Sequence, residues 1–195
     1  MLENYEKIQG IIKLQKLKLP TPSTVFVADY EIQEQEINEF LLGREYVMIR
    51  SEKIGQSTHC PRNLKCPVFE AKKFITELNK DNYVAIVQDY IPLNNLYSGN
   101  ILLLNNSFII EAMQGGPVSK LNREGKVDIH LRINKEGKVI FKQGIELIPS
   151  SDISRIIGLV KDLPLKFHIL EFSAGPDWFY FWHAKEDATS AKLEL

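Results

Sequence analysis

Apolar residues recur along this chain with two different periods, and each period predicts a different kind of element. Where they return every three or four residues, one side of a helix becomes apolar. This pattern predicts helices over residues 3–17, 32–42 and 67–79, and a further helix that begins at Ser150. Where apolar residues alternate with polar ones or run together, the pattern predicts strands. The predicted strands cover residues 23–28, 46–51, 83–89, 99–104, 107–112, 127–133, 138–142, 165–173 and 178–184.

Residues that break regular structure separate these elements. Leu19-Pro-Thr-Pro22 ends the first helix, because proline has no amide proton to donate. Asn105-Asn106 and Ala174-Gly-Pro-Asp177 each join two apolar strands in the manner of a hairpin turn. The chain is therefore predicted to be an α+β protein with mainly antiparallel sheets, in two lobes that cover residues 1–90 and 91–195.

Composition narrows the classes of function. The 195 residues, 44% of them hydrophobic, are enough for one domain or for two small lobes with a core. A net charge of −1 argues against a broad surface for nucleic acid or anionic membrane. There is no signal-peptide pattern at the start, and no apolar run approaches the roughly 20 residues that span a bilayer. We expect a cytoplasmic protein without nucleic-acid or membrane partners.

One carboxylate lies within an otherwise apolar strand. Glu171 is surrounded by apolar residues in the predicted strand 165–173. A buried carboxylate is costly unless a cation or hydrogen-bond donors receive it, so a metal ion or an ion pair would account for this residue. An edge strand with Glu171 facing solvent would account for it equally well.

The two cysteines give a weak metal signal. Cys60 follows His59, and Cys66 comes six residues later. Structural zinc sites take four ligands, often in Cys-x-x-Cys pairs, which this stretch does not supply. Free thiols or a local disulfide are the favoured interpretations.

Five short motifs in this order resemble the nucleotide-binding domain of phosphoenolpyruvate synthase and pyruvate phosphate dikinase. They are the helix ending in Leu19-Pro-Thr-Pro22, Tyr46-Val-Met-Ile-Arg-Ser51, Val87-Gln-Asp-Tyr-Ile91, Ile110-Glu-Ala-Met-Gln-Gly115 and the final hairpin. The resemblance runs over most of the chain. It implies an ATP-grasp fold, in which two α+β lobes hold ATP and magnesium between them.

The resemblance implies two phosphate-binding residues. Lys7 holds the place of the family's phosphate-contacting lysine, and Arg50 matches the arginine of its Val-Arg-Ser-Ser strand. A triphosphate needs fixed positive charge, which arginine supplies as a bidentate fork and lysine as a point charge. The alternative for Lys7 is an ordinary solvated helix lysine.

Three further residues match nucleotide-binding positions of the family. Gln88 and Asp89 fall in the segment between the lobes, where backbone groups contact adenine and an acid can reach the ribose. Glu111 matches the glutamate of a Glu-Ala segment. A turn-capping role for Asp89 and an outward strand position for Glu111 are the competing interpretations.

The final hairpin both matches the family and departs from it. The family has Asp-x-Glu on the first strand, where both carboxylates serve magnesium; here the two places hold Ile169 and Glu171. The return strand ends in His183-Ala184-Lys185 where the family has Gln-x-Arg. Lys185 keeps a charge near the terminal phosphate, and His183 could donate a hydrogen bond, bind a metal or be structural. Magnesium commonly uses only one or two protein carboxylates, so Glu171 with the phosphates and water could still hold one ion. The missing acid therefore weakens the case for catalysis more than it excludes metal binding, because phosphoryl transfer depends on metal and basic residues.

Three functions remain open. The first is a compact phosphotransferase or ligase domain that uses Mg-ATP and an unidentified acceptor, either a small molecule or a partner chain. The second is a nucleotide-binding or regulatory module that has lost catalysis, which Ile169 favours. The third is an interaction protein that keeps the fold without a nucleotide.

Overall fold

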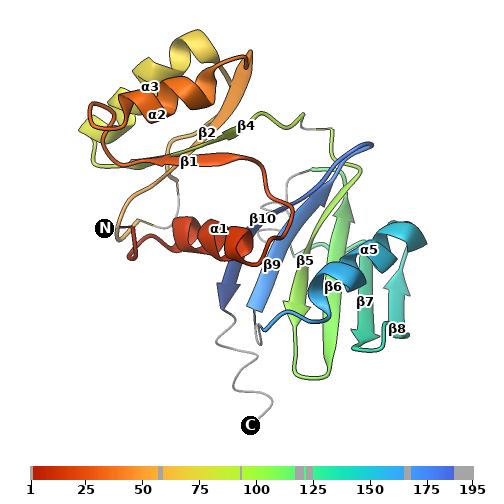
Figure 1. Cartoon of the computed structure of the whole chain (residues 1–195). Helices are drawn as coiled ribbons and strands as arrows, with labels where there is room; N and C mark the ends of the chain where they lie inside the picture. Colours follow the sequence, from red (N-terminus) through yellow and green to blue (C-terminus); the bar gives the residue numbers. More distant parts are fainter. Residues whose placement is uncertain are drawn as a thin grey trace. The chain divides into compact units, whose positions relative to one another are not determined.

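The chain forms two compact units in the computed structural model, which describes residues 2–56, 59–92, 94–116, 121, 125–164 and 168–186. The first unit comprises residues 1–9 and 22–92, and the second comprises residues 10–21 and 93–195. Each unit contains one antiparallel sheet, as Figure 1 shows. The predicted α+β class with mainly antiparallel sheets is confirmed.

The first unit is a four-stranded sheet with the strand order β1-β4-β2-β3. Val47 and Ile49 of β2 and Val87 of β4 are buried in one core with residues of α2 and α3. These two helices cover one face of the sheet (Figure 1). Alternate strand residues point to the opposite face. The elements are β1 (Thr24–Val27), α2 (Glu34–Leu41), β2 (Tyr46–Glu52), β3 (Asn63–Pro67), α3 (Val68–Lys80) and β4 (Val84–Asp89).

A carboxylate of the first unit caps the N-terminus of helix α1 (Glu6–Lys16). Glu52, at the end of β2, accepts hydrogen bonds from the backbone N of Lys7 at 2.9 Å and of Ile8 at 3.1 Å. These amides belong to the first helical turn, which has no backbone acceptors of its own. Glu52 therefore acts as a long-range cap for α1.

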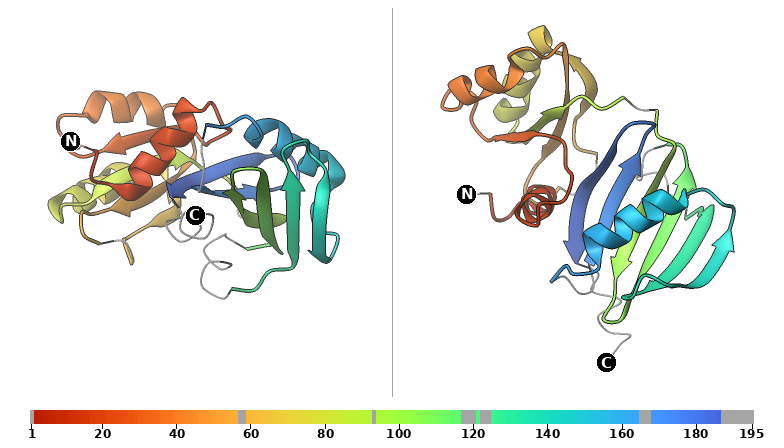
Figure 2. Two further views of the ribbon diagram at one scale, coloured as in Figure 1. Left: turned by 90° about the horizontal axis from the view of Figure 1, so that it is seen from below. Right: turned by 45° about the vertical axis from the view of Figure 1, so that its right-hand side comes forward.

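The second unit is a six-stranded sheet with the order β10-β9-β5-β6-β7-β8. Its core residues include Ile101, Ile110, Leu170 and Phe172 from the strands and Ile156 from α5. Helix α5 lies across one face of this sheet, as the right panel of Figure 2 shows. The elements are β5 (Tyr97–Leu103), β6 (Ser107–Gln114), β7 (Ile129–Asn134), β8 (Val139–Gly144), α5 (Ser150–Val160), β9 (His168–Ala174) and β10 (Phe179–Glu186).

Among the described residues, one strand of the structure is missing from the predicted elements. No element is predicted between the strand 46–51 and the helix that begins at residue 67, but β3 begins at Asn63 and pairs with β2. Only Cys66 of this edge strand is buried, so its sequence carries little apolar periodicity. Residues 165–167 of the first strand of the predicted final hairpin lie outside the described part of the chain. In the described part, no helix is long and apolar enough to cross a membrane.

Candidate functional site

In the first unit, Gln88 lies on the sheet face opposite α2 and α3. It is 1% exposed and sits between Met48 and Thr24 in the strand register. Its Nε2 donates to Thr24 Oγ1 at 3.0 Å, and that hydroxyl donates in turn to the carbonyl of Pro22 at 2.8 Å. This chain of donors fixes the orientation of the amide. Among the described residues, Gln88 Oε1 then has no hydrogen-bond donor.

Arg50 and Lys7 belong to the same part of the first unit. Arg50 pairs with Ile86 and is half-buried on the face that carries Gln88. Glu52, two residues further along β2, binds the backbone N of Lys7. Both predicted phosphate ligands are therefore close to Glu52. Arg50 is two residues away on β2, and the backbone N of Lys7 donates to the Glu52 carboxylate. Sequence reasoning missed Glu52, although an acid at the end of an apolar strand was a signal for it.

Asp89 is held by an ion pair at the end of β4. Its Oδ1 accepts from Arg44 Nε at 2.8 Å, and its Oδ2 accepts from the backbone N of Ser23 at 3.2 Å. Partial burial raises the pKa of this carboxyl, but the hydrogen bonds from Ser23 and Arg44 and the arginine charge outweigh it and hold the pKa below its ordinary value. The bond from Ser23 is typical of a capping aspartate, and contact with a ribose stays a prediction.

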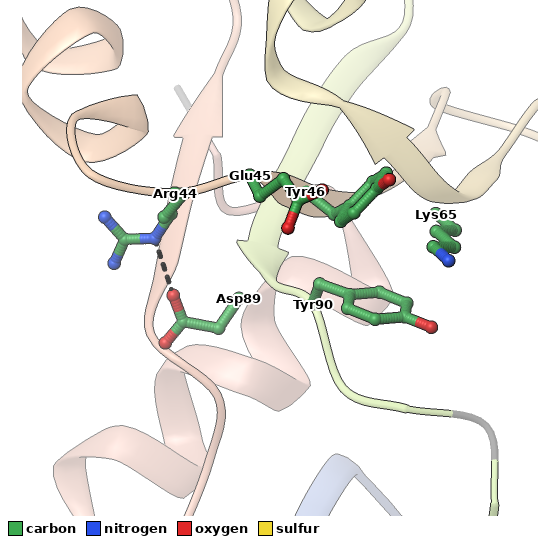
Figure 3. Close-up of a pocket in the computed structure, with 6 residues that line it drawn as sticks. All are labelled: Arg44, Glu45, Tyr46, Lys65, Asp89 and Tyr90. Atoms are coloured by element: carbon green, nitrogen blue, oxygen red, sulfur yellow. Dashed lines mark hydrogen bonds and ion pairs between the residues drawn. The ribbon is translucent and has the colours of Figure 1, made fainter.

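A shallow, open pocket with a volume of about 480 Å³ lies beside Asp89. Figure 3 shows the Arg44–Asp89 pair at one side and Tyr46, Tyr90 and Lys65 at the other. Lys65 Nζ is 4.6 Å from the centre of the Tyr46 ring and 5.7 Å from that of Tyr90, so the aromatic faces attract its charge. None of the lining residues except Asp89 was predicted as a site residue.

In the second unit, five polar residues form one row across the sheet. Each is the direct strand partner of the next, so their side chains share one face. Their sequence neighbours in the strands, such as Leu170 and Ile110, are buried in the core that contains α5. The row therefore lies on the face opposite α5. From β10 to β7 it consists of His183, Glu171, Asn100, Glu111 and His130.

Two ion pairs involve members of this row. Lys185 Nζ is 3.4 Å from Glu171 Oε1, and the two side chains are 32% and 16% exposed. His130 Nδ1 is 3.0 Å from Glu111 Oε1. A carboxylate can only accept, so the Glu111 contact fixes the proton of His130 on Nδ1. Sequence reasoning missed His130, because its position beside Glu111 depends on the pairing of β6 with β7.

His183 lies against helix α1. A Cβ added at Gly10 would overlap the His183 ring and the carbonyl of Ala184, so this helical position accepts only glycine at the present spacing. His183 is thus a member of the polar row, and its imidazole also packs against helix α1. Its predicted catalytic role stays a prediction.

Magnesium binding at Glu171 stays a prediction, because Glu171 keeps only one of the two carboxylates of the family's site. Ile169 stands where the resembled family has the second carboxylate. Magnesium prefers oxygen ligands in octahedral geometry. In the described ranges, no group of three or more His, Cys, Asp or Glu residues could hold a metal ion. The cysteines add no site: Cys60 Sγ contacts the carbonyl of Gln56, and neither thiol is part of a disulfide.

Comparison with known proteins identifies the architecture. No family model and no curated protein matches the chain. Among solved structures, a RimK domain ATP-grasp protein from Sphaerobacter thermophilus DSM 20745 matches 98% of this chain with a TM-score of 0.55 and 11% identity. The D-cycloserine synthetase DcsG also matches 98% of it, with a TM-score of 0.53 and 10% identity. The chain has an ATP-grasp fold.

The ATP-grasp likeness is limited to the fold. The chain spans 61% of the length of the RimK domain protein and 64% of that of DcsG. The predicted ATP-grasp fold is confirmed, whereas these matches give no support to the narrower phosphoenolpyruvate synthase type.

Proposed function

We propose that this chain is a nucleotide-binding ATP-grasp domain, and that ATP is its ligand. The observation that carries the proposal is the position of the predicted ligands on the sheets. Arg50 and Gln88 share the face opposite α2 and α3, while Glu111 and Glu171 share the face opposite α5. Helices α2 and α3 in the first unit, and α5 in the second, pack on the other face of their sheet, so these polar side chains are directed away from those cores.

The amide of Gln88 supports a nucleobase ligand. Its Oε1 is a buried acceptor that no described residue satisfies, and such a group is costly until a donor reaches it. The exocyclic amino group of adenine is a donor of this kind. Arg50 and Lys7 supply the fixed positive charge that the phosphates require.

The activity that we propose is ATP-dependent transfer or ligation to an acceptor, either a small molecule or a partner chain. One observation favours a second candidate, a nucleotide-binding module without catalysis. Ile169 stands where the resembled family has an acidic metal ligand, which removes a group that positions charge during phosphoryl transfer. Both candidates need nucleotide binding, and only the first needs turnover.

A thermal unfolding series with product analysis tests the proposal. ATP should raise the unfolding temperature in a saturable way, because a ligand that binds only the folded state stabilises it. Arg50→Ala should lose most of this effect, whereas Arg62→Ala, at an exposed arginine of the same unit, should keep it. Release of ADP, AMP or phosphate would favour the enzyme, and stabilisation without products would favour the module. No stabilisation by millimolar ATP would contradict both.

A further inference from the structure

We propose that the open pocket beside Asp89 binds a small amino acid whose ammonium and carboxylate groups lie at opposite ends of an apolar body. Lys65 receives the carboxylate, and Glu45 receives the ammonium. The rings of Tyr46 and Tyr90 pack against the apolar body between the two charges. All the lining residues belong to the first unit, so the inference depends neither on the second unit nor on nucleotide binding.

The two tyrosine rings supply the apolar surface of the pocket. Tyr46 is the first residue of β2, Tyr90 follows the last residue of β4, and their ring centres are 5.8 Å apart at an interplanar angle of 55°. Both residues are half-buried, so part of each ring is open to a ligand. Methylene groups that cover these rings lose contact with water, which favours binding.

Lys65 is a cation that no carboxylate neutralises. It lies on the edge strand β3, and its Nζ is 4.6 Å from the centre of the Tyr46 ring. Among the described residues, it forms no ion pair. The ring face attracts the charge, but the three donors of the ammonium have stronger acceptors in a carboxylate. A ligand carboxylate therefore gains a charge-assisted hydrogen bond here.

Two carboxylates line the pocket, and one of them is available to a ligand. Asp89 is already neutralised by Arg44, and it also accepts from the backbone N of Ser23. Glu45 is exposed and has no ion-pair partner within the described ranges. Figure 3 shows Glu45 and Lys65 on opposite sides of the two tyrosine rings. The pocket thus presents one negative and one positive charge with aromatic surface between them.

This charge pattern favours a ligand that carries both charges. A simple carboxylate leaves Glu45 unpaired and is repelled by it, and a simple amine meets the same difficulty at Lys65. A ligand with both groups satisfies both side chains. Because the pocket is shallow and both charged residues are exposed, water and salt screen the contacts. We therefore expect a dissociation constant in the millimolar range.

An NMR titration of the isotopically labelled full chain with ε-aminocaproate tests the inference. Caproate, which lacks the ammonium, and hexylamine, which lacks the carboxylate, are the matched ligands. We expect ε-aminocaproate to shift the backbone amide signals of the lining residues in a saturable way. Each matched ligand loses one of the two charge contacts and should bind about fivefold more weakly.

Two variants remove one charge each and should affect different ligands. Lys65→Met keeps an apolar side chain of similar length, so it should weaken ε-aminocaproate and caproate by about fivefold and leave hexylamine unchanged or tighter. Glu45→Gln should weaken ε-aminocaproate and hexylamine and spare caproate. Lys53→Met is the matched control, because Lys53 Nζ also lies over a tyrosine ring of the same unit, that of Tyr83 at 5.2 Å, but does not line the pocket. We expect no effect from this variant.

The pattern of binding decides the outcome. Equal affinities for ε-aminocaproate, caproate and hexylamine would overturn the inference, and so would the absence of shifts in the lining residues at about 50 mM ligand. Equal weakening of all three ligands by Lys65→Met, in a variant with a native amide spectrum, would also overturn it. If Lys65→Met does not fold, the selectivity of Glu45→Gln decides. Failure of ATP to bind the same protein would refute the proposed nucleotide function and leave this inference intact.

Discussion

The Glu52 carboxylate holds the first turn of helix α1 by accepting the backbone N–H of Lys7 at 2.9 Å. Glu52 is 5% exposed and accepts a second amide, from Ile8. Glu52→Ala would leave both donors without this acceptor, so we expect a loss of about 2–3 kcal/mol in the free energy of unfolding. Glu52→Gln keeps one oxygen acceptor and should lose less. Urea unfolding measures the free energy of unfolding of both variants. An unchanged value for Glu52→Ala would contradict the capping role.

Gly10 and Gly158 form a matched pair of helix glycines. A Cβ at Gly10 would overlap the His183 ring, whereas a Cβ at Gly158 in α5 would meet nothing within 4 Å. Gly10→Ala should therefore destabilise the fold by about 1–3 kcal/mol through overpacking. Gly158→Ala should stabilise it by about 0.5–1 kcal/mol, because alanine loses less backbone entropy in a helix. Equal effects in chemical unfolding would show that the contact with His183 is unimportant.

Asp89 should make stability depend on pH in the acid range. Its carboxyl has a lowered pKa in the folded state, because hydrogen bonds from Ser23 and Arg44 and the arginine charge outweigh the effect of burial. A lowered folded pKa stabilises the protein above the unfolded pKa of about 3.9, and this stabilisation is lost as the pH falls through the folded value. The difference in unfolding free energy between wild type and Asp89→Asn should therefore be constant near neutral pH and shrink below about pH 4. A difference that stays constant down to pH 2 would refute the ion pair as its source.

Gln88→Leu tests the adenine interpretation of the first unit. The substitution removes the unsatisfied Oε1 together with the bond to Thr24. We expect ATP to bind about tenfold more weakly, which corresponds to about 1.4 kcal/mol of lost hydrogen bonding. Inorganic triphosphate, which has no base, should bind wild type and variant equally. An equal loss of affinity for ATP and for triphosphate would show that the substitution acts through the fold and not through base recognition.

Local pattern predicted most of the elements, because one buried face imposes a period on each helix and strand. The largely apolar run 46–51 predicts β2, and the strand register then shows that Arg50 lies on the face opposite Ile49. Strand β3 was missed because it is an edge strand with one buried residue. The final hairpin was predicted from its turn, although residues 165–167 lie beyond what the structure describes.

The candidate site was less accessible to sequence reasoning, because its geometry comes from long-range pairing. Asn100 and Glu171 are neighbours through the pairing of β5 with β9, which no local pattern specifies. Long-range contacts also bring His130 next to Glu111 and bring Glu52 to the first backbone amides of α1. Residue types could indicate that Arg50 and Glu171 were candidates. Only the register shows that Glu171 faces Lys185 diagonally.

Calorimetric titration with ATP is the most direct test of the central claim that this ATP-grasp chain binds a nucleotide. We predict a saturable isotherm for wild type and for Arg62→Ala. The affinity of Arg50→Ala should be weaker by about tenfold or more, because a charge-assisted phosphate contact is lost. The absence of binding heat at millimolar ATP, with no rise in unfolding temperature under the same conditions, would contradict the claim.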